Sequence, residues 1–214
     1  MISLSVVFFI FLFFFALIGS LRGWANELLV SFSVILTLFI ILILENLVGG
    51  IMIPFAKLDD NYNTADVPEG VTMFVMPPED VQPFNKLEET AQKDFRRQFW
   101  FRASILVVLV FFGYQSPALA NLGGDIRREK FQDFLLGLFL GVINSYLIIG
   151  TIWCYMHLAH YPFDPYVIAP KVGDPFFETA NTLINILPPA WLGTSPIIYI
   201  AICLAFLFIL VVFI

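Results

Sequence analysis

The chain has 214 residues, of which 59% are hydrophobic and only 13% are charged. Ordinary soluble domains carry about 25% charged residues, and one soluble core of this size could not bury such an excess of apolar side chains. Lipid must therefore be the solvent for much of the chain. The net charge of −6 argues against a nucleic-acid partner, which would need a basic surface. The composition predicts an all-α membrane protein.

Two apolar runs at the start of the chain predict a transmembrane helical hairpin over residues 1–44. The runs 2–19 and 28–44 are close to the roughly 20 residues that cross the hydrocarbon core. No basic residue precedes Arg22, so we interpret the first run as a retained span and not as a secretory signal. In the polar turn between the runs, Asn26 can cap the second helix and Glu27 suits the positive end of its dipole.

The polar excursion 45–102 has two parts. Several prolines exclude a long helix in the first part. From Asn85 onward, a capping box with Glu88 and apolar residues at every fourth position predict an amphipathic helix at the membrane surface. The residues that we expect to anchor this helix among the lipid headgroups are Arg96, Arg97, Trp100 and Arg102.

A second pair of transmembrane helices is predicted over residues 103–156. The later helix carries Gly137, Gly141 and Ser145 at four-residue spacing. Such a stripe lets a second helix backbone approach closely in lipid, and we interpret it as a helix–helix contact. Glycine is also common in membrane helices that make no such contact, so this alternative stays open.

The last part of the chain comprises a second polar excursion, 157–195, and a C-terminal transmembrane helix, 196–214. Within the excursion, apolar residues of 175–187 share one helical face, which predicts a second interfacial helix that stops at Pro188 and Pro189. The expected architecture is thus four to five transmembrane helices plus two amphipathic interfacial helices.

Three segments of the chain resemble the bacterial colicin V production (CvpA-like) proteins. The turn 21–28, LRGWANEL, resembles the R-G-x-x-x-E turn after the first helix of that family, and 131–149 resembles its G-x-x-x-G helix after a basic turn. The segment 175–189 is similar to the family's C-terminal surface helix, whereas Asn144 stands where that family commonly has arginine or glycine. The resemblance implies a four-helix core in the bacterial cytoplasmic (inner) membrane and a link to colicin V production, a toxin biosynthetic process.

Two groups of residues are candidates for chemistry. His157 and His160 are the only histidines, and their spacing on a helix suits metal ligation or axial binding of a haem or chlorophyll. Histidines that hydrogen-bond at the interface are the simpler interpretation, so no cofactor or metal is expected. In the hairpin turn, Arg22, Gly23 and Glu27 are expected to be accessible to water and headgroups, and we favour a structural Arg22–Glu27 pair over a proton or solute relay.

The sequence contains no nucleophile elbow, phosphate loop, zinc-protease helix or haem-attachment motif, so no enzymatic activity is predicted. The favoured hypothesis is a protein of the colicin V production type that acts in membrane assembly or export through helix packing. Its partners would be the lipid bilayer and other membrane-protein helices, in a homo- or hetero-oligomer. The alternatives are an accessory subunit of a respiratory or photosynthetic complex and, ranked last for lack of intramembrane charge, a small transporter or channel.

Overall fold

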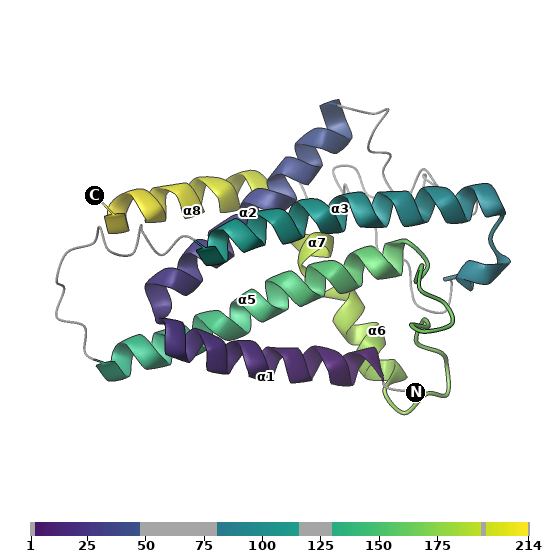
Figure 1. Ribbon diagram of the computed structural model, residues 1–214, viewed down its shortest axis with the longest axis horizontal. Coiled ribbons are helices and arrows are strands. Elements are labelled where there is room, and N and C mark those ends of the chain that lie inside the picture. Colours follow the sequence, from purple (N-terminus) through teal and green to yellow (C-terminus); the bar gives the residue numbers. More distant parts are fainter. Residues whose placement is uncertain (1–2, 48–80, 116–129, 194–195, 214) are drawn as a thin grey trace.

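The computed structural model describes residues 3–47, 81–115, 130–193 and 196–213, and all regular structure within these ranges is helical. The expectation of an all-α membrane protein is confirmed, because four of the described helices are long and apolar enough to cross a membrane. The chain is a multi-pass membrane protein. The four helices are α1 (Leu4–Arg22), α2 (Trp24–Leu47), α3 (Glu89–Gln115) and α5 (Lys130–Leu158) (Figure 1). Most of the first polar excursion, 48–80, lies outside the described residues, as does 116–129.

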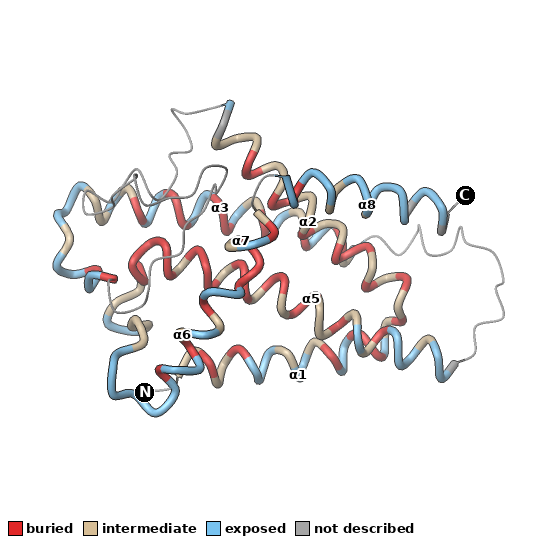
Figure 2. The backbone as a smooth tube through the Cα atoms, turned by 180° about the vertical axis from the view of Figure 1, so that it is seen from behind, coloured by how far each residue is buried: buried red, intermediate tan, exposed pale blue. Residues whose placement is uncertain are grey.

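α2 is the central helix of the bundle and contacts α1, α3 and α5. Its fully buried side chains include Val30, Val34, Leu38 and Ile41, whose spacing places them on one face of a helix. Figure 2 shows buried positions facing the interior of the bundle and exposed positions along the outer sides of the helices. The outer sides are themselves apolar, as a lipid solvent requires.

α1 and α5 lie side by side, and their backbones touch (Figure 1). A Cβ atom on Gly19 would lie 2.7 Å from Gly141 Cα, and a Cβ atom on Gly137 would lie 3.2 Å from Gly23 Cα. Ser145, the next member of the small-residue stripe, is fully buried. The contact partner of this stripe is therefore α1 of the same chain, and van der Waals contact between the two backbones holds the helices together.

A single residue, Gly23, joins α1 to α2. Its φ of 81° is in the region that glycine adopts at low cost, and it ends α1. The Trp24 N–H at the start of α2 donates to Oδ1 of Asp133 on α5, at 3.2 Å. Asn26 does not cap α2 as expected, because α2 begins before it and its Nδ2 donates instead to the Arg22 carbonyl oxygen, at 2.7 Å.

The amphipathic helix expected before the third span is not a separate element. Asn85 lies in a short 3₁₀ turn, η3 (Phe84–Lys86), and α3 then runs without interruption from Glu89 through the apolar segment. The expected capping box with Glu88 is therefore not the start of a surface helix. One buried stripe explains the continuity, since it runs along the whole helix at helical spacing: Phe95, Phe99, Ala103, Leu106, Val110 and Gly113.

The expected second interfacial helix consists of two short helices, α6 (Phe177–Asn185) and α7 (Pro188–Trp191). Pro188 was expected to stop a helix, but it also begins one, α7. At the first position of a helix, the N–H that proline lacks is not needed. α7 packs against α5, where a Cβ atom on Gly150 would lie 2.7 Å from Pro188 Cδ. Gly150 precedes Leu158, the end of α5, by about 12 Å along the helix axis. α7 thus lies beside the transmembrane part of α5 and not at its end.

Tyr146 on α5 holds the segment that contains α6 and α7. The Tyr146 hydroxyl donates to the Ile186 carbonyl oxygen between α6 and α7, and Trp191 Nε1 donates to the Tyr146 oxygen at 2.9 Å. Irregular backbone is tolerated at membrane depth only where protein groups satisfy it. The two prolines, which have no N–H to satisfy, and the tyrosine hydroxyl together meet this requirement.

The expected fifth span corresponds to α8 (Ile197–Phe213). Its 17 residues make it shorter than the four spanning helices, at about 26 Å. It begins beside the middle of α2, where the rings of Tyr199 and Phe39 are 5.9 Å apart. From there it extends toward the end of the molecule at which α1 joins α2 (Figure 1).

Candidate functional site

Two clusters of buried charged residues lie near the two ends of α2. Glu27 and Glu45 are 18 residues apart, which corresponds to about five helical turns and about 27 Å. They therefore share one face of α2. We call the first group, with Arg22, Ser31 and Asn144, the Glu27 cluster. We call the second, with Gln98 and Arg102, the Glu45 cluster.

In the Glu27 cluster, both carboxylate oxygens of Glu27 accept hydrogen bonds. Arg22 Nη1 donates to Oε1 at 2.7 Å, and Asn144 Nδ2 donates to Oε2 at 2.8 Å. The Ser31 hydroxyl donates to Asn144 Oδ1 at 2.6 Å. A buried carboxylate with this many donors is compensated for its loss of water.

The two members of the ion pair differ in exposure, at 26% for the Arg22 side chain and 1% for that of Glu27. The expectation that water and headgroups reach the pair is thus wrong for Glu27. The reason is tertiary, because Asn144 on α5 covers the carboxylate. Arg22 also contacts α3: its Nη2 donates to the Tyr114 carbonyl oxygen at 3.0 Å, and its guanidinium lies 4.3 Å from the centre of the Tyr114 ring. The cluster therefore joins α1, α2, α3 and α5.

In the Glu45 cluster, an ion pair joins α2 to α3. Arg102 Nη2 and Nε both donate to Glu45 Oε1, at 2.6 and 3.0 Å, and Arg102 Nη1 donates to Gln98 Oε1 at 3.1 Å. Arg102 is fully buried. The expectation that Arg102 anchors the chain among headgroups is therefore wrong. It faces the same side of α3 as Phe95 and Phe99, and that side packs into the bundle.

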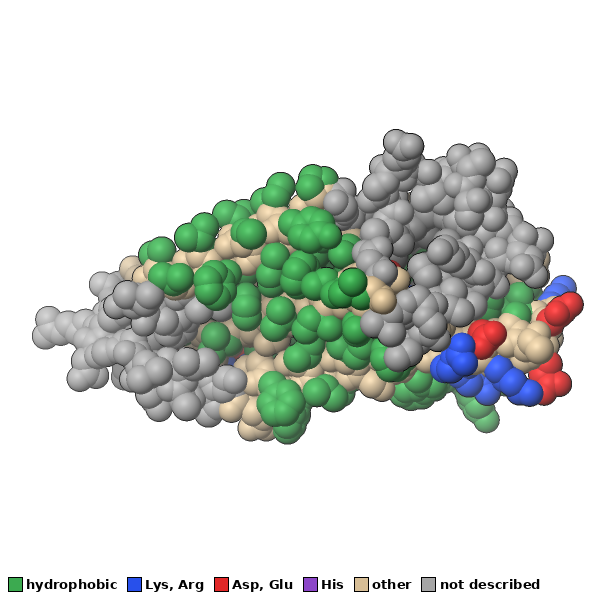
Figure 3. All heavy atoms as spheres, turned by 90° about the horizontal axis from the view of Figure 1, so that it is seen from above, with side chains coloured by type: hydrophobic (Ala, Val, Ile, Leu, Met, Phe, Trp, Pro, Cys, Tyr) green, Lys and Arg blue, Asp and Glu red, His purple; other side chains and the backbone are tan. Residues whose placement is uncertain are grey.

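The other expected anchor residues lie where α3 leaves the apolar part of the molecule. Arg97 pairs with Asp94 at 3.1 Å, and Trp100 is exposed. Arg96 Nη2 donates to the Pro162 carbonyl oxygen at 3.4 Å. Figure 3 shows acidic and basic side chains gathered at one end of a face that is otherwise apolar. The Trp100 ring lies next to this charged end, a position typical of an interfacial aromatic residue.

The two histidines take separate partners and do not share a helical face. α5 ends at Leu158, and His160 has a φ of 56°, so the helical spacing is lost between them. His160 Nδ1 lies 3.1 Å from the Gln82 carbonyl oxygen, and its ring packs on Phe95 at 4.8 Å between centroids. Both rings are buried, His157 inside the bundle and His160 toward the polar loops.

A small hydrogen-bonded group holds His157. Trp153 Nε1 donates to the Tyr161 oxygen at 3.3 Å, and the Tyr161 hydroxyl lies 3.1 Å from His157 Nδ1. Burial raises the pKa of the Tyr161 phenol above its usual range, so the phenol keeps its proton.

Glu45, Asn144 and Gln98 were not expected from the sequence as site residues. One signal was available, because a spacing of 18 residues places Glu27 and Glu45 on one helical face. Nothing in the sequence indicated which side chains would cover them. Among the described residues, no group of three or more His, Cys, Asp or Glu side chains could hold a metal ion.

No family model, no curated protein and no solved structure matches this chain.

Proposed function

We propose that this chain is a non-enzymatic protein of the bacterial cytoplasmic membrane, of the colicin V production type, which acts in membrane assembly or export through helix packing. The observation that carries the proposal is the packing of α8. α8 contacts α2 near its beginning, whereas its later part exposes large apolar side chains in succession: Leu204, Phe206, Leu207, Phe208, Leu210 and Val211. Consecutive exposed residues lie on different sides of a helix. This part of α8 therefore offers most of its circumference to neighbours in the membrane.

The two buried clusters support a scaffold role for the rest of the bundle. Each buried carboxylate is bonded to groups on other helices of the same chain. Such contacts fix the relative positions of α1, α2, α3 and α5. A fixed bundle with one helix, α8, whose later part is exposed around most of its circumference is suited to hold a second membrane protein, because helix association in lipid depends on close packing of preformed helices.

A second candidate function is an accessory subunit of a larger membrane complex. The same feature favours it, since an apolar helix that packs mainly on α2 among the described residues is a docking element for a complex as well as for a transient client. The two functions differ in stoichiometry. A subunit is bound permanently and in a fixed ratio, whereas an assembly or export factor forms contacts that turn over.

Site-specific photo-crosslinking in native membranes tests the proposal. A benzophenone-bearing phenylalanine analogue replaces Phe206 on α8 in one variant and Phe13 on α1 in a matched control, since the two side chains are similarly exposed. We expect protein adducts predominantly from position 206. Native gel electrophoresis with mass spectrometry of gently solubilised membranes then gives the stoichiometry of the adduct partner.

The outcomes separate the candidates. Adducts from position 206 without a stoichiometric large complex support the assembly or export role. A large complex that contains the chain in a fixed ratio supports the subunit role instead. Adducts with lipid alone from both positions would overturn the packing function altogether.

A further inference from the structure

A cleft of about 540 Å³ opens at the end of the bundle opposite the α1–α2 turn. One wall is the segment around η3, and the other is the loop that follows α5. Much of its lining is apolar, including Pro83, Phe84, Val167, Ile168 and Val172. The volume lies within the range of about 300–1,000 Å³ that small-molecule sites occupy. Neither the Glu27 cluster nor the Glu45 cluster contributes to it.

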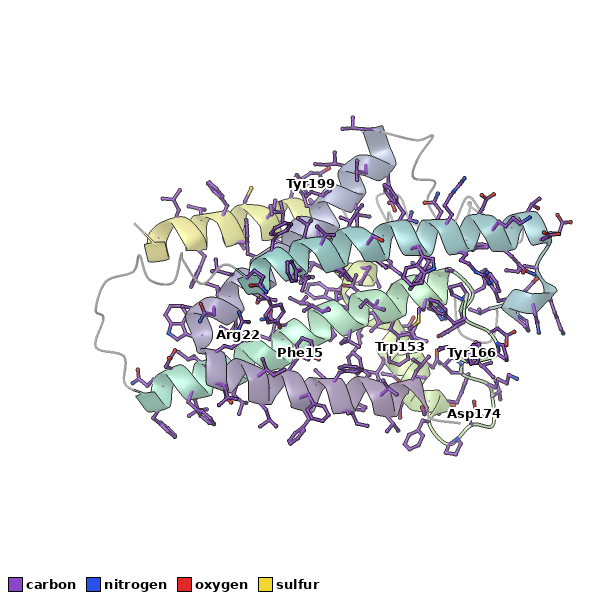
Figure 4. The ribbon with its side chains drawn as sticks, in the orientation of Figure 1. Phe15, Arg22, Trp153, Tyr166, Asp174 and Tyr199 are labelled. Atoms are coloured by element: carbon purple, nitrogen blue, oxygen red, sulfur yellow. The ribbon has the colours of Figure 1, made fainter. Side chains whose placement is uncertain are left out.

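The residues around the cleft are of the kind typical of the lipid headgroup level. The ring of Phe163, in the loop that forms one wall, packs against Trp100 at 5.8 Å between centroids. Trp100 marks the place where α3 passes from apolar to charged surface. The same loop exposes Tyr166 at 91% and Val172 at 74%, and Figure 4 shows Tyr166 at the opposite end of the molecule from Arg22. Exposed aromatic and apolar residues of a loop fit the membrane interface better than water.

Two lysines bring ammonium groups to the cleft. Lys86 lines one wall and Lys171 the other, and among the described residues neither ammonium group forms an ion pair. Asp164 also lines the cleft, and Asp174 lies nearby, where its carboxylate accepts the Lys171 backbone N–H at 3.0 Å. On α3, by contrast, the Lys93 ammonium group is paired with the Glu89 carboxylate at 2.7 Å.

We propose that this cleft binds the headgroup of an anionic phospholipid, with the ammonium groups of Lys86 and Lys171 contacting the phosphate. The apolar wall formed by Val167, Ile168 and Val172 receives the glycerol backbone and the first acyl carbons. Basic pockets at the membrane surface select anionic headgroups because each lysine adds a favourable interaction with the lipid phosphate. Apolar walls at the same depth favour a lipid over a free anion, which would leave them unfilled.

Native mass spectrometry of the purified full chain in mild detergent tests this proposal. The protein is titrated with phosphatidylglycerol, with phosphatidylcholine and with inorganic phosphate. The K86Q/K171Q variant is compared with K86R/K171R, which keeps both charges, and with K93Q, which removes a lysine outside the cleft. We expect K86Q/K171Q to bind phosphatidylglycerol about tenfold more weakly, with K86R/K171R and K93Q close to the parent chain.

Three results would overturn the proposal. Unchanged phosphatidylglycerol binding by K86Q/K171Q would show that the cleft lysines are not involved. An equal loss in K93Q would show a general effect of surface charge. Displacement of phosphatidylglycerol by millimolar inorganic phosphate would identify a site for the free anion instead of a lipid. Because all substituted lysines are exposed, the variants keep the packed interior, and circular dichroism checks this directly.

Discussion

Glu27 and Glu45 face the same side of α2, yet their charges are compensated in different ways. Glu27 receives donors on both carboxylate oxygens, from Arg22 and from Asn144, and its arginine is partly exposed to solvent. Glu45 receives both of its hydrogen bonds on one oxygen and from one side chain, Arg102, which is fully buried. The Glu27 cluster is spread over four helices, whereas the Glu45–Arg102 ion pair joins α2 to α3.

The two clusters compensate the same buried charge with different numbers of side chains. A buried charge is costly unless it is paired and hydrogen-bonded. Where several groups share the compensation, the loss of one leaves the others in place. Where one arginine provides it, the loss of that arginine leaves a buried charge alone.

The largest effect is expected from Arg102→Ala. It removes the partner of Glu45 and leaves a buried carboxylate, at an expected cost of about 3–5 kcal/mol in the free energy of unfolding. Denaturant titration in mixed micelles, followed by circular dichroism, measures this change. Arg22→Ala should cost less, because Glu27 keeps Asn144. An equal cost for the two variants would show that Asn144 does not compensate the Glu27 charge when Arg22 is lost.

Removing both charges of the Glu45 pair should recover most of that loss. In Glu45→Leu/Arg102→Met, apolar side chains of similar volume replace the ion pair, and such replacements are often neutral or stabilising. The same titration should place the double variant within about 1.5 kcal/mol of the parent chain. A double variant as unstable as Arg102→Ala would mean that the arginine acts mainly through Gln98 and its other neighbours.

At the other end of α2, Gly141→Ala should separate α1 from α5. The added Cβ would lie 3.1 Å from Gly19 Cα, and overpacking of this kind costs about 1–3 kcal/mol. Phe139→Leu, on the exposed side of the same helix, is the matched control and should change little. If Gly141→Ala unfolds no more easily than the control, the close contact of the two backbones does not stabilise the bundle.

Asn144→Leu tests the shared compensation in the Glu27 cluster. It removes the donor to Glu27 Oε2 and leaves the Ser31 hydroxyl only the Glu27 carbonyl oxygen, at 3.3 Å, at a cost of about 1–3 kcal/mol. Ser145→Ala is the control at the next position, since the buried Ser145 hydroxyl has no hydrogen-bond partner among the described residues. Equal stability of the two variants would show that Asn144 contributes only its volume.

The smallest effect is expected for Lys93→Ala. Its ion pair with Glu89 lies on the exposed part of α3, where solvent screening leaves surface pairs with little net energy. Thermal unfolding of this variant should be indistinguishable from that of the parent chain. A clear shift in the melting temperature would indicate that this end of α3 packs against something more than solvent.

The length and apolarity of the four runs determined that the chain forms spanning helices. Both are local properties of the sequence, and a long apolar helix satisfies its own backbone hydrogen bonds within the hydrocarbon core. The spacing of Gly137 and Gly141 is likewise a local property, and it indicated a close helix contact. The sequence could not give the partner, which is α1 of the same chain.

Only the tertiary structure decided where the charged and amphipathic residues lie. Arg102 and Trp100 are two positions apart in a run that predicted headgroup anchors, but one is fully buried and the other is exposed. The apolar face of 175–187 fits a membrane surface or a protein groove equally well by its periodicity, and the chain places it in contact with the bundle. Whether a polar or amphipathic segment meets water, lipid or protein depends on what the other helices bring to it, and that is a property of the packed bundle and not of the local sequence.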